Sequence, residues 1–262
     1  MTIRIATWNI NSIRLREALV CKVLEENEID ILCLQETKTQ EQFFPRRTFE
    51  KMGYSEIFVR GQKSYNGVAI ISRVGITENS SIDFCSKGDA RHISARLDNG
   101  VFLHNFYVPA GGEIADRTVN EKFGHKLDFL NEMRDFSSTR KSEKLIIVGD
   151  FNIAPLSEDV SNHKQLLKVV SHTPIEIEYL NKILKEGDLI DLTRKDFPTG
   201  LLYSWWSYRS PNWEKSDKGR RLDHIWASRS LSNNFHSSKI IKKVRGFEKP
   251  SDHVPVLVDF DS

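Results

Sequence analysis

Short apolar runs recur along the whole chain and are separated by polar residues and turn formers. Several runs alternate apolar and polar positions, which is typical of half-buried strands. They predict strands over residues 3–8, 29–35, 67–73, 92–98, 101–108, 144–149, 221–228 and 254–260. Many strands, often adjacent in sequence, and few helices favour a mixed or antiparallel α+β layered domain.

Three further segments carry apolar residues at helical spacing. The pattern that predicts them consists of Leu15, Leu19 and Val23, then Phe123, Leu127, Leu130 and Met133, and then Ile177, Leu180, Ile183 and Leu184. The third helix has the clearest ends. Thr173 and Glu176 fit a capping box, Pro174 fits the first helical position, and Gly187 fits the stop.

Length and composition narrow the class of protein. The chain has 262 residues and 39% apolar content, and we interpret residues 1–262 as one domain. The apolar runs are too short to cross a membrane, and the first residues lack an export signal, so we expect a cytoplasmic protein. Cys21, Cys33 and Cys85 are odd in number and widely spaced. They predict buried free thiols and neither a disulfide framework nor a zinc site.

Charge is spread unevenly along the chain. Residues 194–249 contain 13 Lys/Arg and 5 Asp/Glu, a local net charge of +8, whereas the whole chain has only +2. The remainder therefore carries −6. Such asymmetry indicates a polyanionic partner on one side, although a solvated basic face without a partner explains the charge equally well.

Polar side chains follow, or directly precede, most of the predicted strands. Each one alone is typical of a turn, but together they offer acids, amides, a phenol and an imidazole at several strand ends. These residues are Asn9, Asn11, Glu36, Asn105, Tyr107, Asp150, Asn152, Asp223, Asp252 and His253. Carboxylates suit Mg²⁺ or Mn²⁺, amides and phenols donate to phosphate oxygens, and an imidazole can carry a proton. Together these groups predict phosphodiester hydrolysis.

Longer motifs resemble a known family. "TWNIN", "LQETK", "YNGVAIIS", "NFYVP", "GDFNIAP", "YSWWSYR", "RLDHIWAS" and "PSDHVPV" are similar to the exonuclease III branch of the endonuclease/exonuclease/phosphatase superfamily. That branch contains the apurinic/apyrimidinic endonucleases of base excision repair. The resemblance extends from residue 2 to about residue 260. It implies a four-layer αββα sandwich, in which two packed mixed β-sheets are flanked by helices and the site lies at one edge.

The resemblance also implies a divalent metal, Mg²⁺ or alternatively Mn²⁺. By this likeness Glu36 is the main metal ligand. Asn9 and Asn11 lie beside it, and Asp252 is the other acidic contributor.

The same resemblance assigns the reacting groups. Asp150 either activates the attacking water or protonates the leaving oxygen. Asn152 and His253 contact the scissile phosphate, and Asp223 orients His253. Tyr107 is a further donor on the phosphate side.

Residues on the DNA side follow from the later motifs. Trp205, Arg220 and Leu222 take the positions that wall a pocket for the abasic sugar. Asn162 falls where the family has an asparagine beyond the "GDFN" loop, and Arg209 flanks the pocket.

Several positions depart from the family pattern. Asn11 stands where some members have Asp, and Ala110 where many have a polar residue. Arg220 occupies a position that is apolar in many relatives, so we expect it to reach a phosphate. Residues 161–174 also differ from the common pattern. We expect these departures to affect phosphate contacts and metal affinity and to leave the reaction class unchanged.

The resulting hypothesis is a metal-dependent DNA repair phosphodiesterase. It cuts double-stranded DNA 5′ to abasic sites, trims 3′ ends as a 3′→5′ exonuclease and removes 3′ phosphates, and we expect a monomer. Two alternatives stay open. One is a phosphatase for lipid head groups or inositol phosphates, and the other is a DNA-binding module without activity. The basic segment and its tryptophans favour DNA, because cations track phosphates and rings fill a flipped-nucleotide pocket.

Overall fold

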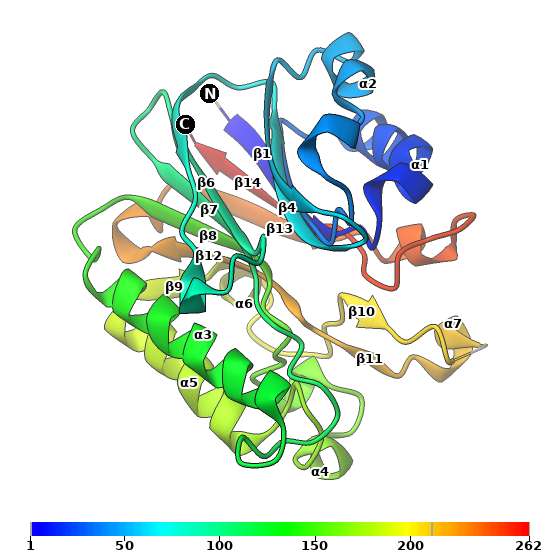
Figure 1. Cartoon of the computed structure of the whole chain (residues 1–262), viewed down its shortest axis with the longest axis vertical. Helices are drawn as coiled ribbons and strands as arrows, with labels where there is room; N and C mark the ends of the chain where they lie inside the picture. Colours follow the sequence, from blue (N-terminus) through cyan, green and yellow to red (C-terminus); the bar gives the residue numbers. More distant parts are fainter. Residues whose placement is uncertain (1, 211, 262) are drawn as a thin grey trace.

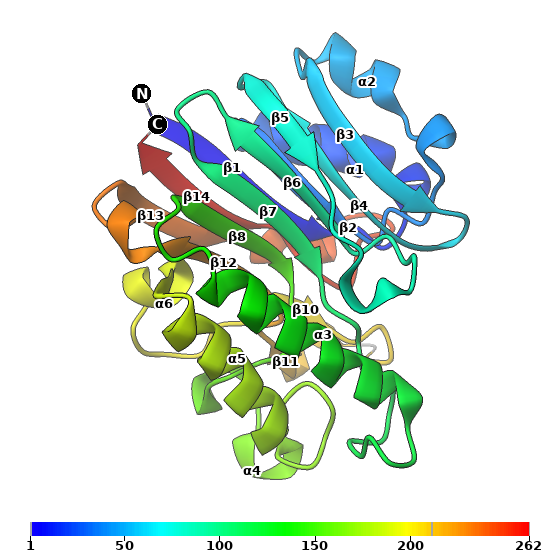
Figure 2. The same cartoon turned by 60° about the vertical axis from the view of Figure 1, so that its left-hand side comes forward.

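Two six-stranded sheets pack face to face, and helices cover both outer sides (Figures 1 and 2). The computed structural model describes residues 2–210 and 212–261. The first sheet has the order β13 (Phe235–Ile240), β14 (Val256–Asp261), β1 (Thr2–Asn9), β2 (Ile31–Gln35), β4 (Tyr65–Ser72) and β3 (Glu56–Gln62). The second has the order β5 (Ile76–Ser80), β6 (His92–Leu97), β7 (Phe102–Tyr107), β8 (Leu145–Asp150), β12 (Asp223–Ser228) and β9 (Leu189–Asp191). Each sheet is mixed, since β1 with β2 and β7 with β8 run parallel among antiparallel neighbours.

Helices lie on the two outer faces. Figures 1 and 2 show α1 (Ile13–Glu26) and α2 (Arg46–Lys51) beside the first sheet, with α3 (Glu121–Ser138) and α5 (Pro174–Glu186) across the second. Shorter elements connect these layers. They are α4 (His163–Leu166), α6 (Leu192–Asp196), α7 (Trp213–Ser216) and the two-residue strands β10 (Trp205–Trp206) and β11 (Gly219–Arg220).

The alternation within β1 shows how the layers form. Ile3 and Ile5 point into the apolar layer between the sheets, whereas Ala6 and Trp8 point into the layer beneath α1. A third apolar cluster joins the second sheet to α3 and α5. The central strands thus bury side chains on both faces, in three apolar layers between helices and sheets, and the predicted four-layer α+β sandwich is confirmed.

The helix predictions hold with one correction. All three helices form, and the capping box of Thr173 and Glu176 is present. Val23 is buried as predicted, but Leu15 is 58% exposed, and Ile13, Val20 and Leu24 complete the buried face of α1. Arg16 leaves the helical conformation (φ −123°, ψ 18°), so the first turn is out of phase with the rest of the helix.

The strand prediction was incomplete. It missed the edge strands β3, β5, β9 and β13 and the β10–β11 pair. β5 and β13 are largely solvent-exposed, and β9 has only three residues, so none shows a run of apolar positions. Edge strands need less burial than central ones, and apolar pattern alone misses them.

The cysteine prediction also needs a correction. All three thiols are free, but only Cys33 is fully buried, while Cys21 and Cys85 are half-buried. Within the described residues, no helix combines the length and the apolar character that crossing a membrane requires.

Candidate active site

The topology brings the predicted polar residues to one edge of the two sheets, opposite the paired ends of the chain. Asn9 ends β1, and Glu36 follows β2, its parallel neighbour. Tyr107 and Asp150 end the parallel strands β7 and β8, directly opposite each other. Asp223 begins the antiparallel strand β12, opposite Asp150. Parallel strands end, and antiparallel strands begin, at the same edge, so these side chains converge.

Asp150, His253 and Asp223 form a buried chain of charges. Nδ1 of His253 lies 2.8 Å from Oδ2 of Asp223, and its Nε2 lies 3.7 Å from Oδ2 of Asp150. A carboxylate only accepts, so Nδ1 carries a proton and the imidazole is held in one orientation. All three residues are at most 4% exposed.

Burial and neighbouring charges shift the pKa values of Asp150 and His253 in directions that suit proton transfer. Burial raises the pKa of Asp150 to about 7, against the attraction of His253 and two hydrogen bonds. Burial by itself lowers the pKa of His253, but the carboxylates of Asp223 and Asp150 outweigh it and raise that pKa to about 10. Near neutral pH, His253 is therefore a cation beside a carboxyl that can exchange a proton.

Asn152 fixes the other side of Asp150. Its backbone N–H donates to Oδ1 of Asp150 at 2.9 Å, and its side-chain amide donates to Oδ2 at 3.2 Å. The same amide donates to the carbonyl of Val108 at 3.0 Å. Asn152 (φ 54°) and Glu36 (φ 50°) both adopt left-handed backbone conformations, which asparagine tolerates well and glutamate rarely adopts.

Glu36 gathers donors and a cation. Asn9 and the hydroxyl of Tyr107 donate to its Oε1 at 2.9 and 2.8 Å, and Nζ of Lys38 lies 2.7 Å from Oε2. Burial opposes ionisation of this carboxyl, but Lys38 and the two donors together lower its pKa. The carboxyl group of Glu36 is therefore ionised at neutral pH. Burial raises the pKa of Tyr107 well above its usual range, so Tyr107 stays a donor.

Asn11 and Asp252 extend the hydrogen-bonded network that begins at Glu36 and Lys38. Nδ2 of Asn11 donates to Asp252 at 3.2 Å, and Nε1 of Trp205 donates to the other oxygen of Asp252 at 2.9 Å. Asp252 therefore reaches Glu36 only through Asn11 and Lys38. Asp252 thus lies between Asn11 and Trp205, and its role as the other acidic contributor to a metal site stays a prediction.

The oxygen atoms around Lys38 fit a metal cation. Its ammonium lies 2.7 Å from Glu36 and 2.6 Å from Oδ1 of Asn11, so these two oxygens already surround a positive charge. A carboxylate and an amide carbonyl are ligands that hard cations such as Mg²⁺ accept. Sequence reasoning missed Lys38, although it stands inside the quoted motif "LQETK".

A second group of ligand atoms exists in the same site. Atoms of Asp150, Asp223 and His253 all lie within 4.8 Å of one another. Nδ1 of His253 is engaged by Asp223, however, and the group includes an imidazole, which suits zinc or copper better than magnesium. The described residues therefore offer two candidate cation positions, one at Glu36 and Asn11 and one at this group.

Four predicted DNA-side residues line one cleft. Asn162, Trp205, Arg209 and Arg220 share it with residues from α4, from the end of α7 and from the loops beside β10 and β11. Figure 1 shows β10, β11 and α7 projecting from the body beside this edge. Asn162 does not point freely into the cleft, because its side chain accepts from the N–H of Gln165 and caps α4.

The predicted pocket wall is partly structural. The guanidinium of Arg220 lies 5.3 Å from the centre of the Trp205 ring, and its Nη1 donates to Val170 O and Ser171 Oγ. Leu222 is 4% exposed and packs behind Trp205 with Ala154 and Val160. These two residues back the tryptophan, which forms the accessible part of the wall.

Comparisons with known proteins agree with this geometry. Residues 6–253 match the Endonuclease/Exonuclease/phosphatase family. The chain is 31% identical to exodeoxyribonuclease III of Haemophilus influenzae over 97% of this chain and 98% of that protein. It is 27% identical to an exodeoxyribonuclease of Bacillus subtilis over 97% of each chain.

Solved structures share the fold. An AP endonuclease from Archaeoglobus fulgidus superposes with a TM-score of 0.92 at 33% identity, over 99% of this chain and all of that one. A 3′ phosphatase from Neisseria, NExo, bound to a product DNA hairpin, superposes with a TM-score of 0.91 at 30% identity, with the same coverage.

Proposed function

The chain belongs to the endonuclease/exonuclease/phosphatase family, and from this premise we propose that it is a metal-dependent nuclease of DNA repair. It hydrolyses the phosphodiester 5′ to an abasic site and removes nucleotides or phosphates from 3′ ends. Its relatives include proteins named for both kinds of activity, an AP endonuclease and a 3′ phosphatase.

One observation carries this proposal. The proton-transfer chain of Asp150, His253 and Asp223 stands next to the cation position at Glu36, and Asn9 bridges the two with a 2.9 Å hydrogen bond to each side. Hydrolysis of a phosphodiester needs both halves, because a proton must leave the attacking water while negative charge grows on the phosphate.

The residues of the site divide these tasks. Asp150, whose pKa lies near 7, takes a proton from the attacking water. His253, protonated and oriented by Asp223, presents positive charge to the phosphate oxygens as their charge grows. Tyr107 donates to Glu36, and Asn152 donates to Val108 and Asp150, so each exchanges one of these bonds for the phosphate when DNA binds.

Glu36 and Asn11 would hold the cation, and we propose Mg²⁺, with Mn²⁺ as a substitute. A divalent ion there would stabilise negative charge on phosphate oxygen. Asn11 replaces a carboxylate found in some relatives, so this site holds its ion with one formal charge fewer.

The cleft beside the site suits DNA better than an inositol phosphate. Trp205 offers a flat apolar surface, while Arg209, Lys218 and Arg220 add positive charge around it. An abasic duplex has a phosphate backbone that these cations can follow. It also has a sugar without a base, which the tryptophan ring can receive when that sugar is extruded. We expect the enzyme to act as a monomer in the cytoplasm.

A nicking assay tests the proposal. A duplex with one abasic analogue is incubated with enzyme and Mg²⁺, or with EDTA, and the product ends are identified. We expect a 3′ hydroxyl immediately 5′ of the abasic site, in the presence of Mg²⁺ only. DNA binding without cleavage would indicate a non-enzymatic module, and release of phosphate from inositol phosphates alone would indicate the other family chemistry.

A further inference from the structure

The loop that follows β8 has its backbone carbonyls held by side chains from three different places. Nζ of Lys126 on α3 lies 2.8 Å from the carbonyl of Asn152. Nε2 of His224 on β12 lies 2.8 Å from the carbonyl of Ile153. Nδ1 of His172, just before α5, lies 2.6 Å from the carbonyl of Ala154.

These three hydrogen bonds satisfy carbonyl groups of a largely buried loop. Phe151, Ile153 and Ala154 are fully buried, and an irregular buried segment has no neighbouring strand to satisfy its polar backbone. A carbonyl only accepts, so each ring nitrogen carries the proton in its bond. The loop is held at three consecutive residues, beginning at Asn152 itself.

Lys126 is the unusual member of this set. Its side chain is 0% exposed, which is rare for lysine, and its ammonium lies 2.5 Å from the equally buried Glu176. A second carbonyl, Ala110, accepts from it at 3.3 Å. The stem is also enclosed, because a Cβ at Gly111 would lie 2.9 Å from Cδ of Lys126. The ammonium is therefore held at one position.

Glu176 serves two purposes at once. It closes the capping box at the start of α5 with Thr173, and it accepts two bonds from the N–H of Ser171 at 3.0 Å each. A carboxylate bound so fully stays in place whether or not Lys126 is charged. Lys126 thus joins a fixed helix start to the loop that carries Asn152.

We infer that Lys126 is a positioning residue of the reaction, which, with His224 and His172, sets the backbone of Asn152 so that its amide meets both Asp150 and the scissile phosphate. This inference rests on the proposed function. Asn152 holds a left-handed φ of 54°, a conformation that asparagine adopts more readily than most residues, so the contacts on either side decide where its amide points. Lys126 fixes this residue from the carbonyl side, opposite the N–H that binds Asp150.

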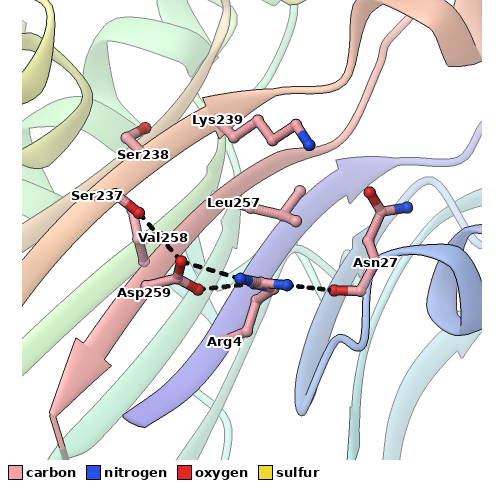
Figure 3. A pocket seen from close by; sticks show the side chains of 8 residues that line it. All are labelled: Arg4, Asn27, Ser237, Ser238, Lys239, Leu257, Val258 and Asp259. Atoms are coloured by element: carbon pink, nitrogen blue, oxygen red, sulfur yellow. Dashed lines mark hydrogen bonds and ion pairs between the residues drawn. The ribbon is translucent and has the colours of Figure 1, made fainter.

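A matched control lies at the other end of the molecule. Arg4 on β1 likewise joins an ion pair to a backbone carbonyl, with Asp259 at 2.7 Å and the carbonyl of Asn27 at 2.8 Å (Figure 3). Arg4 stands five residues before Asn9 on the same strand, or about 17 Å away at the usual strand rise. Losing it removes the same kinds of bond without touching the site.

The experiment compares Lys126→Met with Arg4→Met in steady-state cleavage of the abasic duplex. Methionine keeps the length of the stem and removes the ammonium. We expect kcat of Lys126→Met to fall about 10- to 100-fold, because small misplacement of a reacting geometry has effects of this size. KM for DNA should stay within about threefold, because the cleft is unchanged. Arg4→Met should keep the parent kcat and KM.

A second variant guards against misfolding. Lys126→Met with Glu176→Gln removes both buried charges, so no uncompensated charge remains, and it should show the same loss of kcat. Amide hydrogen exchange of residues 149–156 should rise in both Lys126 variants and stay at the parent level in Arg4→Met.

The outcomes separate the inference from the proposed function. If the parent cleaves and both Lys126 variants match its kcat, the positioning role is wrong. An equal loss of kcat in Arg4→Met would also overturn it, because general destabilisation would then explain the effect. If the parent itself does not cleave DNA, the proposed function fails, and unchanged exchange of residues 149–156 would then reject the role of Lys126 independently.

Discussion

The side-chain amide of Asn9 donates one hydrogen bond to Glu36 and another to Asp150, each at 2.9 Å. Asn9 is fully buried, and the same carboxyl groups are the cation ligand and the proton acceptor of the proposed reaction. One amide therefore keeps two negative groups close together and hydrogen-bonded. This contact links the metal half of the site to the proton-transfer half.

Removing that amide should affect both halves. In Asn9→Ala, two buried carboxylates lose a shared donor, so we expect kcat to fall about 10²-fold, as for other lost site donors. The Mg²⁺ concentration for half-maximal rate should rise as well. Single-turnover rates across a Mg²⁺ titration measure both effects. A variant with the parent's Mg²⁺ dependence and a lower rate would show that Asn9 serves Asp150 alone.

The metal position is tested by adding and removing charge. Glu36→Ala should raise the Mg²⁺ needed for half activity and lower the maximal rate, because it removes the carboxylate of the cation site. Asn11→Asp should lower that Mg²⁺ requirement by restoring a second negative charge. Overlapping titrations of Glu36→Ala and the parent would place the cation elsewhere, first at Asp150, Asp223 and His253.

Stability should depend on pH through two buried histidines on the second sheet. Burial lowers the pKa of His104 to about 3 and, with His104 as neighbour, lowers that of His92 well below its usual range. The unfolded chain takes up protons near pH 6.5, and the folded chain does not. The contribution of each histidine to the free energy of unfolding is therefore fully present above pH 6.5. It is lost toward pH 3, by about 1.4 kcal/mol per pH unit for each histidine.

Urea unfolding between pH 7 and 4.5 measures this slope. His104→Gln keeps an acceptor for His92, which lies 3.1 Å away, and removes one titrating group, so the slope should fall by about 1.4 kcal/mol per pH unit. His236→Gln, at an exposed position, should leave the slope nearly unchanged. Equal slopes for parent and His104→Gln would mean that carboxyl groups dominate.

Discrimination between abasic and intact DNA should depend on Trp205. An abasic sugar loses little stacking or pairing when it is extruded, whereas a normal nucleotide loses a few kcal/mol. Trp205→Ala should therefore lower the ratio of abasic incision to 3′ resection on the same duplex. If that ratio stays unchanged, Trp205 is only packing against Leu222 and Arg220.

Arg220→Leu should shift the same ratio toward abasic incision. The guanidinium covers the Trp205 ring and is tied to Val170 and Ser171, so leucine would restore the apolar wall found in many relatives. The expectation that Arg220 reaches a phosphate stays a prediction. Weaker salt dependence of DNA binding in Arg220→Leu would support it, since each neutralised phosphate steepens that dependence.

The local pattern predicted an α+β layered domain with polar side chains at its strand ends, and the family resemblance supplied the four layers and the single site at one edge. Apolar runs ending in Asn9 or Asp150 indicate where a rigid strand stops, and parallel pairing then fixes where its last side chain lies. The edge strands β5 and β13 were missed because their side chains are largely solvated, and β9 because it has only three residues. Leu15 is exposed because the backbone at Arg16 leaves the helical conformation. The spacing of apolar residues in the sequence cannot reveal that distortion.

Charged residues that act from behind the site were harder to predict. Lys126 lies three residues after Phe123 and four before Leu130, so the helical period places it on the buried face. Lysine is usually solvated, and its partner Glu176 belongs to another helix. Only the packing of α3 against α5 shows that the two side chains meet beneath the loop that carries Asn152.

The most direct test of the account is single-turnover cleavage of an abasic duplex by Asp150→Asn, with DNA affinity measured on the same preparation. The amide keeps the shape of the carboxyl group, but it has one accepting oxygen in place of two and cannot take a proton at neutral pH. We expect parent-like DNA binding and a cleavage rate lower by about 10²- to 10⁴-fold. Near-parental cleavage by Asp150→Asn would contradict the assignment of Asp150 as the group that activates water.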